Sequence, residues 1–445
     1  MKRILVLGAG RSSAALIRYL VENAPAHDWK VTVGDVSPEA ARAKIGDSSH
    51  ATAIRFDIEE QEAARSAIGQ SDIVVSLLPP RFHALVALRC LEERKHFLTA
   101  SYATEELLGF DKEAREKGLL FLNECGLDPG IDHLSAMKVI DHIRDRGGII
   151  TSFESFTGGL IARETDPENP WRYKFTWNPR NVVTAGQGTA RYLHDGSSKY
   201  IPYQQLFRRL TPVHVPGHGD YEGYANRDSL KYIDLYGLHG ISTMLRGTLR
   251  HKGFCSAWNV LVQLGCCDDS YPMADVGKLT HASFIDAFLP PVPGVDDPQE
   301  KLAMVFGLAK ESRELAMLRW SGFFEHTPVG LNAGTPASVL EHILNKRWAL
   351  HPDDRDEIVM WHRFRYTQEG KGREIQASLV ATGVDQTFTA MARTVGLPLG
   401  IATRRLAAGH IKARGVCIPT TREFYDPILA ELATLGIALK EIQIR

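Results

Sequence analysis

The sequence carries almost no excess charge of either sign. Its 52 lysines and arginines stand against 53 aspartates and glutamates, which gives a formal net charge of −1 at pH 7. Proteins that bind nucleic acid present a basic excess, because they must neutralise phosphates. We therefore expect no nucleic-acid partner.

Long apolar runs are missing as well. No stretch approaches the about 20 apolar residues that a membrane-spanning helix needs, so no membrane partner is expected. Lys2 and Arg3 precede only a short apolar run that ends at Gly8. This pattern is too short for a signal peptide.

Cysteine is scarce, and none of the cysteines stands at the spacing of a metal site. The six are Cys90, Cys125, Cys255, Cys266, Cys267 and Cys417. The adjacent pair at 266 and 267 cannot readily form a disulfide. A reduced, cytoplasmic protein without a bound metal is the simplest interpretation.

The chain has the length and composition of a multidomain globular protein. It has 445 residues, of which 44% are hydrophobic and 24% are charged. One hydrophobic core rarely serves a chain of this length, so two or three domains are expected.

The first residues have the pattern of a dinucleotide-binding βαβ unit. The apolar run Ile4 to Leu7 leads into Gly8-Ala9-Gly10, and a helical pattern follows from Ala14 to Leu20. In such a unit Gly8 permits a tight turn, Gly10 allows the backbone to approach a pyrophosphate, and the helix N-terminus attracts the phosphates. The alternative is an ordinary strand-to-helix turn, since Ser13 replaces the usual third glycine. The predicted cofactor-binding residues here are Gly8, Gly10, Arg11 and Ser12.

A second strand pattern ends in Asp35, 27 positions after Gly8. A carboxylate at this place accepts hydrogen bonds from the adenosine ribose and repels a 2′-phosphate, which favours NAD over NADP. The alternative is a turn or capping aspartate, because Ser37-Pro38-Glu39 has the pattern of a helix start. Arg11 and Arg42 could reach a phosphate, so NADP stays possible.

Strand and helix patterns continue to alternate up to residue 125. The predicted strands are 53–57, 72–78, 96–100 and 119–123, with helical patterns at 82–93 and 105–117. Six strands with crossover helices make a doubly wound, parallel Rossmann sheet.

The pattern changes after residue 150. A strand is expected at 149–156, and two alternating strands at 355–366 and 374–382 surround the hairpin turn 368–372. The segment 264–350 has a helical pattern, including 301–320. The tail carries helical patterns at 388–395, 401–408 and 425–435, and we expect it to pack against the nucleotide domain.

Ligands of an open parallel sheet bind outside the carboxyl ends of its strands. That rule selects Leu78 and Pro79 for the cofactor and Ser101 for the substrate. It also selects Tyr102 and Asp128 as candidate catalytic residues. A tyrosine can donate a hydrogen bond to substrate, and a carboxylate can transfer a proton or bind an amine.

Each of these residues also has a structural interpretation. Tyr102 could be a core residue, and Asp128 could belong to a turn because Pro129 follows it. Asp132 is expected to cap the next helix, His83 and His133 are expected to be structural, and Cys125 is expected to pack in the core.

Arginines gather in two later motifs, Asn226-Arg227-Asp228-Ser229 and Arg246-Gly247-Thr248-Leu249-Arg250. Guanidinium groups bind carboxylates through two parallel hydrogen bonds, so they suit a substrate with several carboxylates. The alternative is surface ion pairing. Alternation along a strand would place Arg246 and Arg250 on one face.

With these motifs the chain resembles the saccharopine reductase family, the glutamate-forming saccharopine dehydrogenases, along essentially its whole length. The motifs are Gly8-Ala9-Gly10, Ser76 to Pro79 with Phe82-His83-Ala84, Ser101-Tyr102, Asn123 to His133, Gly158-Gly159-Leu160, Tyr173 to Trp177, Asn226 to Ser229, Arg246 to Arg250, and Met391 to Gly396. The loop after the sixth strand and the two arginine motifs are the specific part of this resemblance.

The resemblance implies three domains and a homodimer. A dinucleotide-binding domain would comprise 1–127 with 390–445, and a mixed α/β substrate and dimerisation domain 128–263 with 351–389. An all-helical insertion would comprise 264–350.

The resemblance also implies a reaction. Hydride leaves the carbon beside the secondary amine of saccharopine, and the imine is hydrolysed to glutamate and 2-aminoadipate semialdehyde. Arg227, Arg246 and Thr248 would bind the substrate. Biosynthetic members typically use NADP and carry a basic residue where Asp35 stands, so NAD-dependent lysine breakdown is the preferred direction here.

Two other functions fit parts of the sequence. A carboxynorspermidine or homospermidine synthase also reduces an imine, but its substrates have fewer carboxylates for Arg227 and Arg246 to bind. A non-catalytic nucleotide-binding regulator would need Gly8, Gly10 and Asp35 but not the motifs after the fifth and sixth strands.

Overall fold

The computed structural model describes residues 1–185 and 187–444. Its chain divides into two compact units. The first contains Met1–Ile150, Tyr366–Arg373 and Leu379–Arg445, and the second contains Thr151–Arg365 and Glu374–Ser378.

The first unit is built on a parallel sheet of seven strands. Their order is β15-β6-β5-β4-β1-β2-β3, and neighbouring strands run parallel. The strands are β1 (Lys2–Leu7), β2 (Trp29–Asp35), β3 (Ala51–Arg55), β4 (Ile73–Ser76), β5 (His96–Thr99), β6 (Leu120–Leu122) and β15 (Gly415–Cys417). The predicted doubly wound Rossmann sheet is therefore confirmed.

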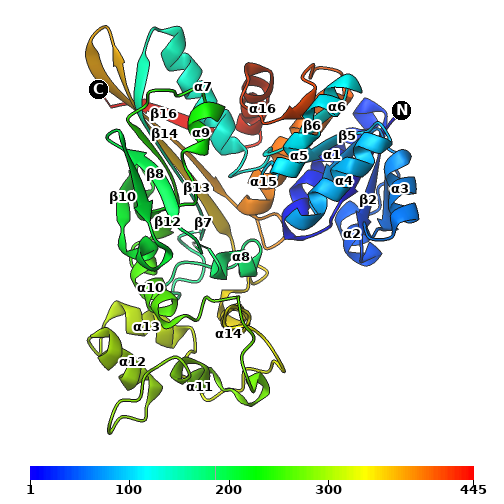
Figure 1. Cartoon of the computed structure of the whole chain (residues 1–445). Coiled ribbons are helices and arrows are strands. Elements are labelled where there is room, and N and C mark those ends of the chain that lie inside the picture. Colours follow the sequence, from blue (N-terminus) through cyan, green and yellow to red (C-terminus); the bar gives the residue numbers. More distant parts are fainter. Residues whose placement is uncertain (186, 445) are drawn as a thin grey trace. The chain divides into compact units, whose positions relative to one another are not determined.

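Helices connect these strands and cover the sheet (Figure 1). They are α1 (Ala14–His27), α2 (Pro38–Ile45), α3 (Gln61–Gly69), α4 (His83–Glu92), α5 (Glu105–Gly109), α6 (Asp111–Glu116), α7 (Ile131–Asp145), α15 (Ala390–Ala407) and α16 (Arg422–Thr434). Two short 3₁₀ turns, η1 (Arg11–Ser13) and η2 (Pro80–Phe82), precede α1 and α4.

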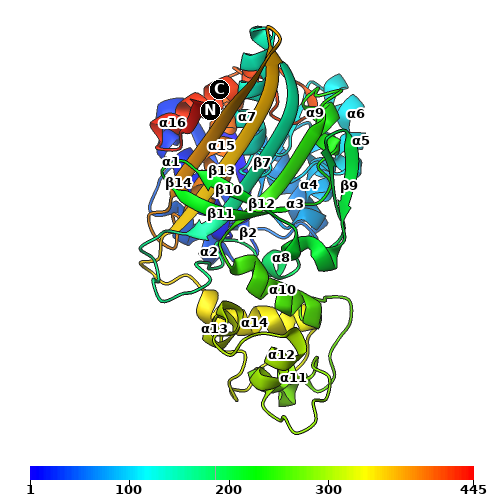
Figure 2. The same cartoon turned by 90° about the vertical axis from the view of Figure 1, so that its left-hand side faces the viewer.

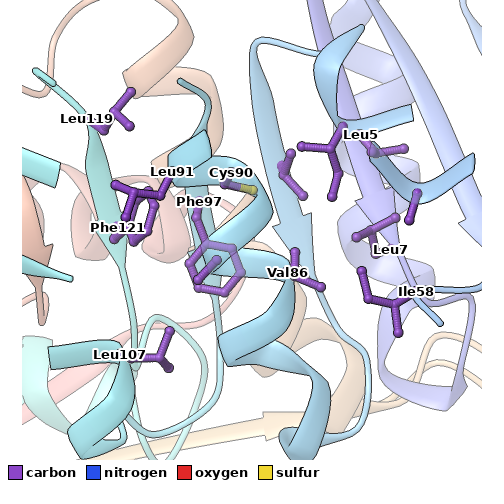
Figure 3. Packing of buried hydrophobic residues seen from close by; sticks show 14 of the residues in the cluster. Leu5, Leu7, Ile58, Val86, Cys90, Leu91, Phe97, Leu107, Leu119 and Phe121 are labelled. Atoms are coloured by element: carbon purple, nitrogen blue, oxygen red, sulfur yellow. The ribbon is translucent and has the colours of Figure 1, made fainter. Parts of the chain in front are cut away.

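A cluster of buried apolar side chains lies under this sheet (Figure 3). Leu5 and Leu7 of β1, Val74 of β4, Phe97 of β5 and Phe121 of β6 all belong to it. The rings of Phe97 and Phe121 meet edge to face, with centroids 5.6 Å apart. Burial of such side chains contributes about 1.5–3 kcal/mol each. Helices cover both faces of a parallel sheet, so its central strands carry apolar side chains on both faces.

The tail completes the first unit, as expected. Strand β15 pairs with β6, and α15 packs on α1 (Figure 1). The two helices come close because Gly396 lacks a side chain: a Cβ there would lie 2.7 Å from the Leu16 nitrogen. Arg404 and Glu431 form an ion pair next to Tyr19 of α1, which also hydrogen-bonds both.

Several predicted boundaries were wrong. The helical patterns 388–395 and 401–408 form the single helix α15, which contains Pro398. Pro398 has no N–H to donate to the helix. The helix continues past it because α15 is buried on one face and packs on α1. The predicted strand 53–57 lies two residues earlier, and the helical pattern 105–117 is divided into α5 and α6.

The second unit contains a mixed sheet. Its strands follow the order β10-β11-β12-β7-β13-β14, with β8 pairing to β12 and β9. They are β7 (Ile149–Ile161), β8 (Ala190–His194), β9 (Ser197–Ile201), β10 (Leu210–Val215), β11 (Gly219–Ala225), β12 (Thr243–His251), β13 (Asp356–Gln368) and β14 (Lys371–Thr382). Figure 2 shows β12, β7, β13 and β14 side by side. The predicted hairpin is confirmed, and its turn is Glu369-Gly370. A last strand, β16 (Leu439–Gln443), follows β14 in the order of this sheet, although its residues are grouped with the first unit.

Helices dominate residues 264–350, as the pattern predicts (Figure 2). The predicted helix 301–320 is divided at Gly307, where the backbone turns to φ +62°. The helices of the second unit are α8 (Pro179–Val183), α9 (Lys231–Leu235), α10 (Phe254–Leu264), α11 (His281–Asp286), α12 (Pro298–Phe306), α13 (Arg313–Trp320) and α14 (Pro336–Trp348), and its 3₁₀ turns are η3 (Tyr203–Arg208) and η4 (Val276–Lys278). Whether this segment is a separate domain, within the three-domain division given above, stays a prediction.

Candidate functional site

The turn after β1 has the geometry that a pyrophosphate needs. Gly8 adopts φ +100°, and a Cβ there would lie 3.0 Å from the Leu77 carbonyl oxygen, so glycine is required. A Cβ at Gly10 would meet nothing within 4 Å, so the backbone is open at this point. Arg11 is exposed and Ser12 is half-buried beside it. These features fit a dinucleotide at the N-terminal end of α1.

Ser13 occupies the position of the third glycine of the usual motif. Its hydroxyl donates a hydrogen bond of 2.8 Å to the Gly10 carbonyl oxygen. The side chain is buried at the start of α1, where the usual glycine would allow close packing. A small hydroxyl residue is therefore compatible with this turn.

Asp35 ends β2 and holds two backbone groups. Its carboxylate accepts hydrogen bonds from the N–H of Ala9 at 2.7 Å and of Ser37 at 3.0 Å. The cap of α2 is Ser37, whose hydroxyl accepts from the N–H of Ala40. These hydrogen bonds support the interpretation of Asp35 as a turn residue. An ionised carboxylate has about four acceptor positions, so two more remain for ribose hydroxyls.

The loops after β4 and β5 meet at a buried histidine. His83 starts α4 and is 2% exposed. Its Nδ1 lies 3.0 Å from the Ser76 hydroxyl, and its Nε2 lies 2.8 Å from the Ser101 hydroxyl. Burial lowers the pKa of His83 to about 4, so its ring is neutral at pH 7 and orients Ser101. Leu78 is half-buried and Pro79 is exposed in the preceding loop.

Tyr102 and Asp128 come from two loops and lie next to each other. The Tyr102 hydroxyl is 3.4 Å from Asp128 Oδ1, and both residues are half-buried. Asp128 stands at the tip of a turn that Gly126 closes by donating its N–H to the Pro129 carbonyl oxygen at 3.0 Å. A phenol and a carboxylate at this separation can share a proton or bind one polar group of a ligand together.

Three neighbours of this pair are buried and structural in their contacts. Asp132 lies within the first turn of α7 rather than at its cap, and its carboxylate accepts the Gly130 N–H at 2.6 Å. His133 hydrogen-bonds Glu124 at 2.8 Å. Cys125 is buried in the core, and burial raises the pKa of its thiol, so it stays protonated.

In the second unit the motif from Asn226 to Ser229, which follows β11, contacts the motif from Arg246 to Arg250 on β12. The N–H of Arg246 donates to the Ser229 hydroxyl at 2.9 Å, and the N–H of Asn226 donates to the Arg246 carbonyl oxygen at 2.9 Å. The Arg246 guanidinium lies 3.9 Å from the centre of the Tyr232 ring, a cation–π contact. Arg227 is exposed and has φ +47°, a conformation that is uncommon outside glycine.

Arg246, Thr248 and Arg250 alternate along β12 and therefore share one face. Arg246 and Arg250 are 7% and 4% exposed, so surface ion pairing was the wrong interpretation for both. The Arg250 guanidinium lies among Tyr173, Tyr224 and Phe254.

Glu124 is the residue of this site that the sequence did not single out. It follows β6 by two positions and is 3% exposed, with φ +56°. A glutamate two positions after a predicted strand is ordinary in sequence. Its burial and its backbone conformation are visible only in the structure.

The described residues contain no group of three or more histidines, cysteines, aspartates or glutamates arranged to hold a metal ion. None of their helices combines the length and apolar character of a membrane span.

The matching family models and the similar proteins all point to one family. Residues 4–122 match the saccharopine dehydrogenase NADP binding domain, and residues 126–437 match the saccharopine dehydrogenase C-terminal domain. The chain is 31% identical to the NADP(+)-dependent, L-glutamate-forming saccharopine dehydrogenase of Schizosaccharomyces pombe, over 99% of each chain. It is 33% identical to the mitochondrial alpha-aminoadipic semialdehyde synthase of Mus musculus, over 98% of this chain and 47% of that one. The chain thus spans about half the length of the latter relative.

The fold agrees with these sequence matches. The apo, L-Glu-forming saccharopine dehydrogenase of Saccharomyces cerevisiae superposes with a TM-score of 0.89 over all of both chains, at 31% identity. The resemblance inferred from the motifs is therefore confirmed.

The burial of His83 predicts a pH dependence of stability. Its pKa is about 4 in the folded protein and near 6.5 when unfolded, so the unfolded chain binds the proton more tightly. The resulting stability is present above pH 6.5 and is lost as pH falls towards 4, by about 3 kcal/mol in total. His83→Gln should flatten this part of the curve, measured as melting temperature against pH.

His239→Gln is the matched control, because the side chain of His239 is exposed. It should leave the curve unchanged. Equal slopes for wild type and His83→Gln would contradict the assignment of a buried, neutral imidazole.

Proposed function

The chain belongs to the saccharopine dehydrogenase family, and from that premise we propose that it interconverts saccharopine with glutamate and 2-aminoadipate semialdehyde. The observation that carries the proposal is the match over 99% of both chains to an L-glutamate-forming relative. That match does not support the polyamine-forming alternative. A non-catalytic regulator would have no use for the loops after β5 and β6.

The reaction removes two electrons and then adds water. When bound, the nicotinamide accepts a hydride from the carbon beside the secondary amine of saccharopine. The resulting imine takes up water and divides into glutamate and the semialdehyde, and one proton is released overall. The groups of this chain have to bind the amine, orient the water and hold that proton.

We assign these tasks to Asp128 and Tyr102. The Asp128 carboxylate would bind the amine and stabilise the positive charge of the iminium. The Tyr102 hydroxyl, 3.4 Å away, would donate to Asp128 or to the attacking water. Ser101, whose hydroxyl His83 orients, would donate a hydrogen bond to substrate.

The substrate carboxylates are assigned to the arginines of the second unit. Saccharopine has three carboxylates, and Arg227 and Arg246 supply two guanidinium groups for them, with Thr248 as a neutral donor. The stacking of Arg246 on Tyr232 limits its rotamers, so less entropy is lost when it binds.

We propose NAD as the preferred cofactor and NADP as possible. The support is Asp35 at the end of β2, because a carboxylate at this place in such folds accepts hydrogen bonds from the ribose and repels a 2′-phosphate. The relative in Schizosaccharomyces pombe is named for NADP(+), so a preference for NAD would distinguish this chain from that relative. The proposed cofactor contacts are Gly8, Gly10, Arg11, Ser12, Asp35, Leu78 and Pro79.

The remaining parts of the proposal concern the protein in the cell. We propose the direction of lysine breakdown, since NAD is commonly the oxidant in degradation. We also propose a homodimer, which the resemblance implies. A cytoplasmic location agrees with the six unpaired cysteines of the described residues.

One assay tests the function. Purified protein is mixed with saccharopine and either NAD or NADP, and reduced nucleotide is followed by its absorbance. We expect saccharopine-dependent reduction, with higher kcat/KM for NAD. Absence of turnover with both nucleotides, in a protein that binds them, would overturn the proposal.

The cofactor assignment predicts the effect of Asp35→Asn. This change keeps the shape of the side chain and removes the charge that repels a 2′-phosphate. The ratio of kcat/KM for NAD to that for NADP should fall about tenfold or more, since charges near 4 Å interact by several kcal/mol. Asp57→Asn, beyond the end of the neighbouring β3, is the control and should leave the ratio unchanged. An unchanged ratio in Asp35→Asn would mean that another residue selects the cofactor.

The carboxylate assignment predicts the effects of Arg227→Ala and Arg246→Ala. Each should raise the KM for saccharopine about 10- to 100-fold, because a charge-assisted hydrogen bond contributes about 1.5–3 kcal/mol. The Kd of the nucleotide should not change. Arg209→Ala, on an exposed side chain of the same unit, is the control. Equal losses of saccharopine and nucleotide affinity would instead indicate a structural role.

A further inference from the structure

Glu124 is an unusual residue for its position. It is 3% exposed, and its φ of +56° lies in the left-handed region that favours glycine. A buried carboxylate costs several kcal/mol unless it is paired, and a non-glycine residue at this φ adds strain. Glycine would remove both costs. The side chain must therefore contribute something that offsets them.

The contacts of Glu124 surround Tyr102. Its N–H donates to the carbonyl oxygen of Ser101 at 3.0 Å, on one side of Tyr102. Its Oε1 accepts the N–H of Ala103 at 3.0 Å, on the other side. The three-residue segment that carries the Tyr102 hydroxyl is thus held at both ends by a single residue from the loop after β6.

A second set of contacts joins Glu124 to the loop that carries Asp128. Its Oε2 lies 2.8 Å from Nε2 of His133, which is fully buried in α7. The other ring nitrogen of His133 is 3.9 Å from the Asp132 carboxylate, and that carboxylate accepts the Gly130 N–H at 2.6 Å. Gly130 ends the turn at whose tip Asp128 stands. A continuous series of polar contacts therefore runs from the backbone beside Tyr102 to the backbone beside Asp128.

We propose that Glu124, locked by His133, is a positioning residue that sets the separation of the Tyr102 hydroxyl and the Asp128 carboxylate. The inference rests on the proposed function, in which these two groups act on the substrate. Glu124 itself does not touch the substrate. Displacement of a catalytic group by about 1 Å can cost about a hundredfold in rate, so a residue that fixes both loops affects turnover through them.

Two substitutions distinguish the contribution of the Glu124 carboxylate to turnover from that of the Glu124 backbone. Glu124→Gly keeps the backbone conformation and its N–H but removes the link to Ala103 and His133. Glu124→Gln keeps an acceptor for the Ala103 N–H. We expect kcat to fall about 10- to 100-fold in Glu124→Gly and much less in Glu124→Gln. The Kd of the nucleotide should stay within twofold in both.

A double-mutant cycle with Tyr102→Phe distinguishes positioning from general damage. Once the hydroxyl is absent, only the placement of Asp128 still depends on Glu124, so Glu124→Gly should then lower kcat by a clearly smaller factor than it does with Tyr102 present. Losses that multiply in the double variant, or an unchanged kcat in Glu124→Gly, would overturn the proposal. Should Glu124→Gly fail to fold, His133→Gln serves in its place and should show the same dependence on Tyr102.

Hydrogen exchange provides a readout that does not need turnover. Segment 101–105 should lose protection in Glu124→Gly, because the Ala103 N–H loses its acceptor. The control is Glu431→Gln, which changes a glutamate of the same unit that hydrogen-bonds Tyr19 instead, and it should leave that segment protected. Unchanged exchange in Glu124→Gly overturns the positioning role. Loss of protection in a protein that does not oxidise saccharopine would overturn the proposed function alone.

Discussion

Parallel pairing of β1, β4, β5 and β6 is the constraint on which the candidate site depends. Because these strands run in one direction, the loops that follow them all start at one edge of the sheet. The hydrogen-bond ladder continues into those loops. The N–H of Leu77 donates to the Leu7 carbonyl oxygen at 2.8 Å, and the N–H of Cys125 donates to that of Thr99 at 3.2 Å. The loops are therefore held by the same interactions as the strands.

Polar side chains then fix the loop segments that the backbone hydrogen bonds do not reach. Asp35 holds the turn at Ala9, His83 holds Ser101, and Glu124 holds the segment around Tyr102. Each is a hydrogen bond between residues distant in sequence, and each joins two strand ends. In the second unit the Arg246 backbone has the same role, because it joins β12 to the segment from Asn226 to Ser229. In both units hydrogen bonds between separate segments hold the groups that are proposed to act on ligands.

The sequence predicted the parts of the fold that depend on periodicity. Apolar strands alternate with helical patterns through residue 125, and the long β13–β14 hairpin has clear alternation. The three-residue strand β15 was not predicted, because so short a segment has no period and pairs only where β6 offers an edge. Helix α15 was divided in the prediction, because Gly396 and Pro398 break the local pattern while packing on α1 holds the helix together.

The candidate site was predictable where motifs carry a mechanism. The glycine turn, Asp35, and the loops holding Tyr102 and Asp128 follow from the rule on strand ends. The partners of His83 and the role of Glu124 were not predictable, since they depend on φ and on contacts between loops. The burial of Arg246 and Arg250 was not predictable either, because it depends on which strands flank β12.

The most direct measurement is a crystal structure of the protein with saccharopine and oxidised nucleotide. The account predicts the nicotinamide at the carboxyl ends of β4, β5 and β6, the substrate amine within hydrogen-bond distance of Asp128, and substrate carboxylates on Arg227 and Arg246. A substrate that contacts neither arginine, or a nucleotide bound away from the Gly8–Gly10 turn, would contradict it.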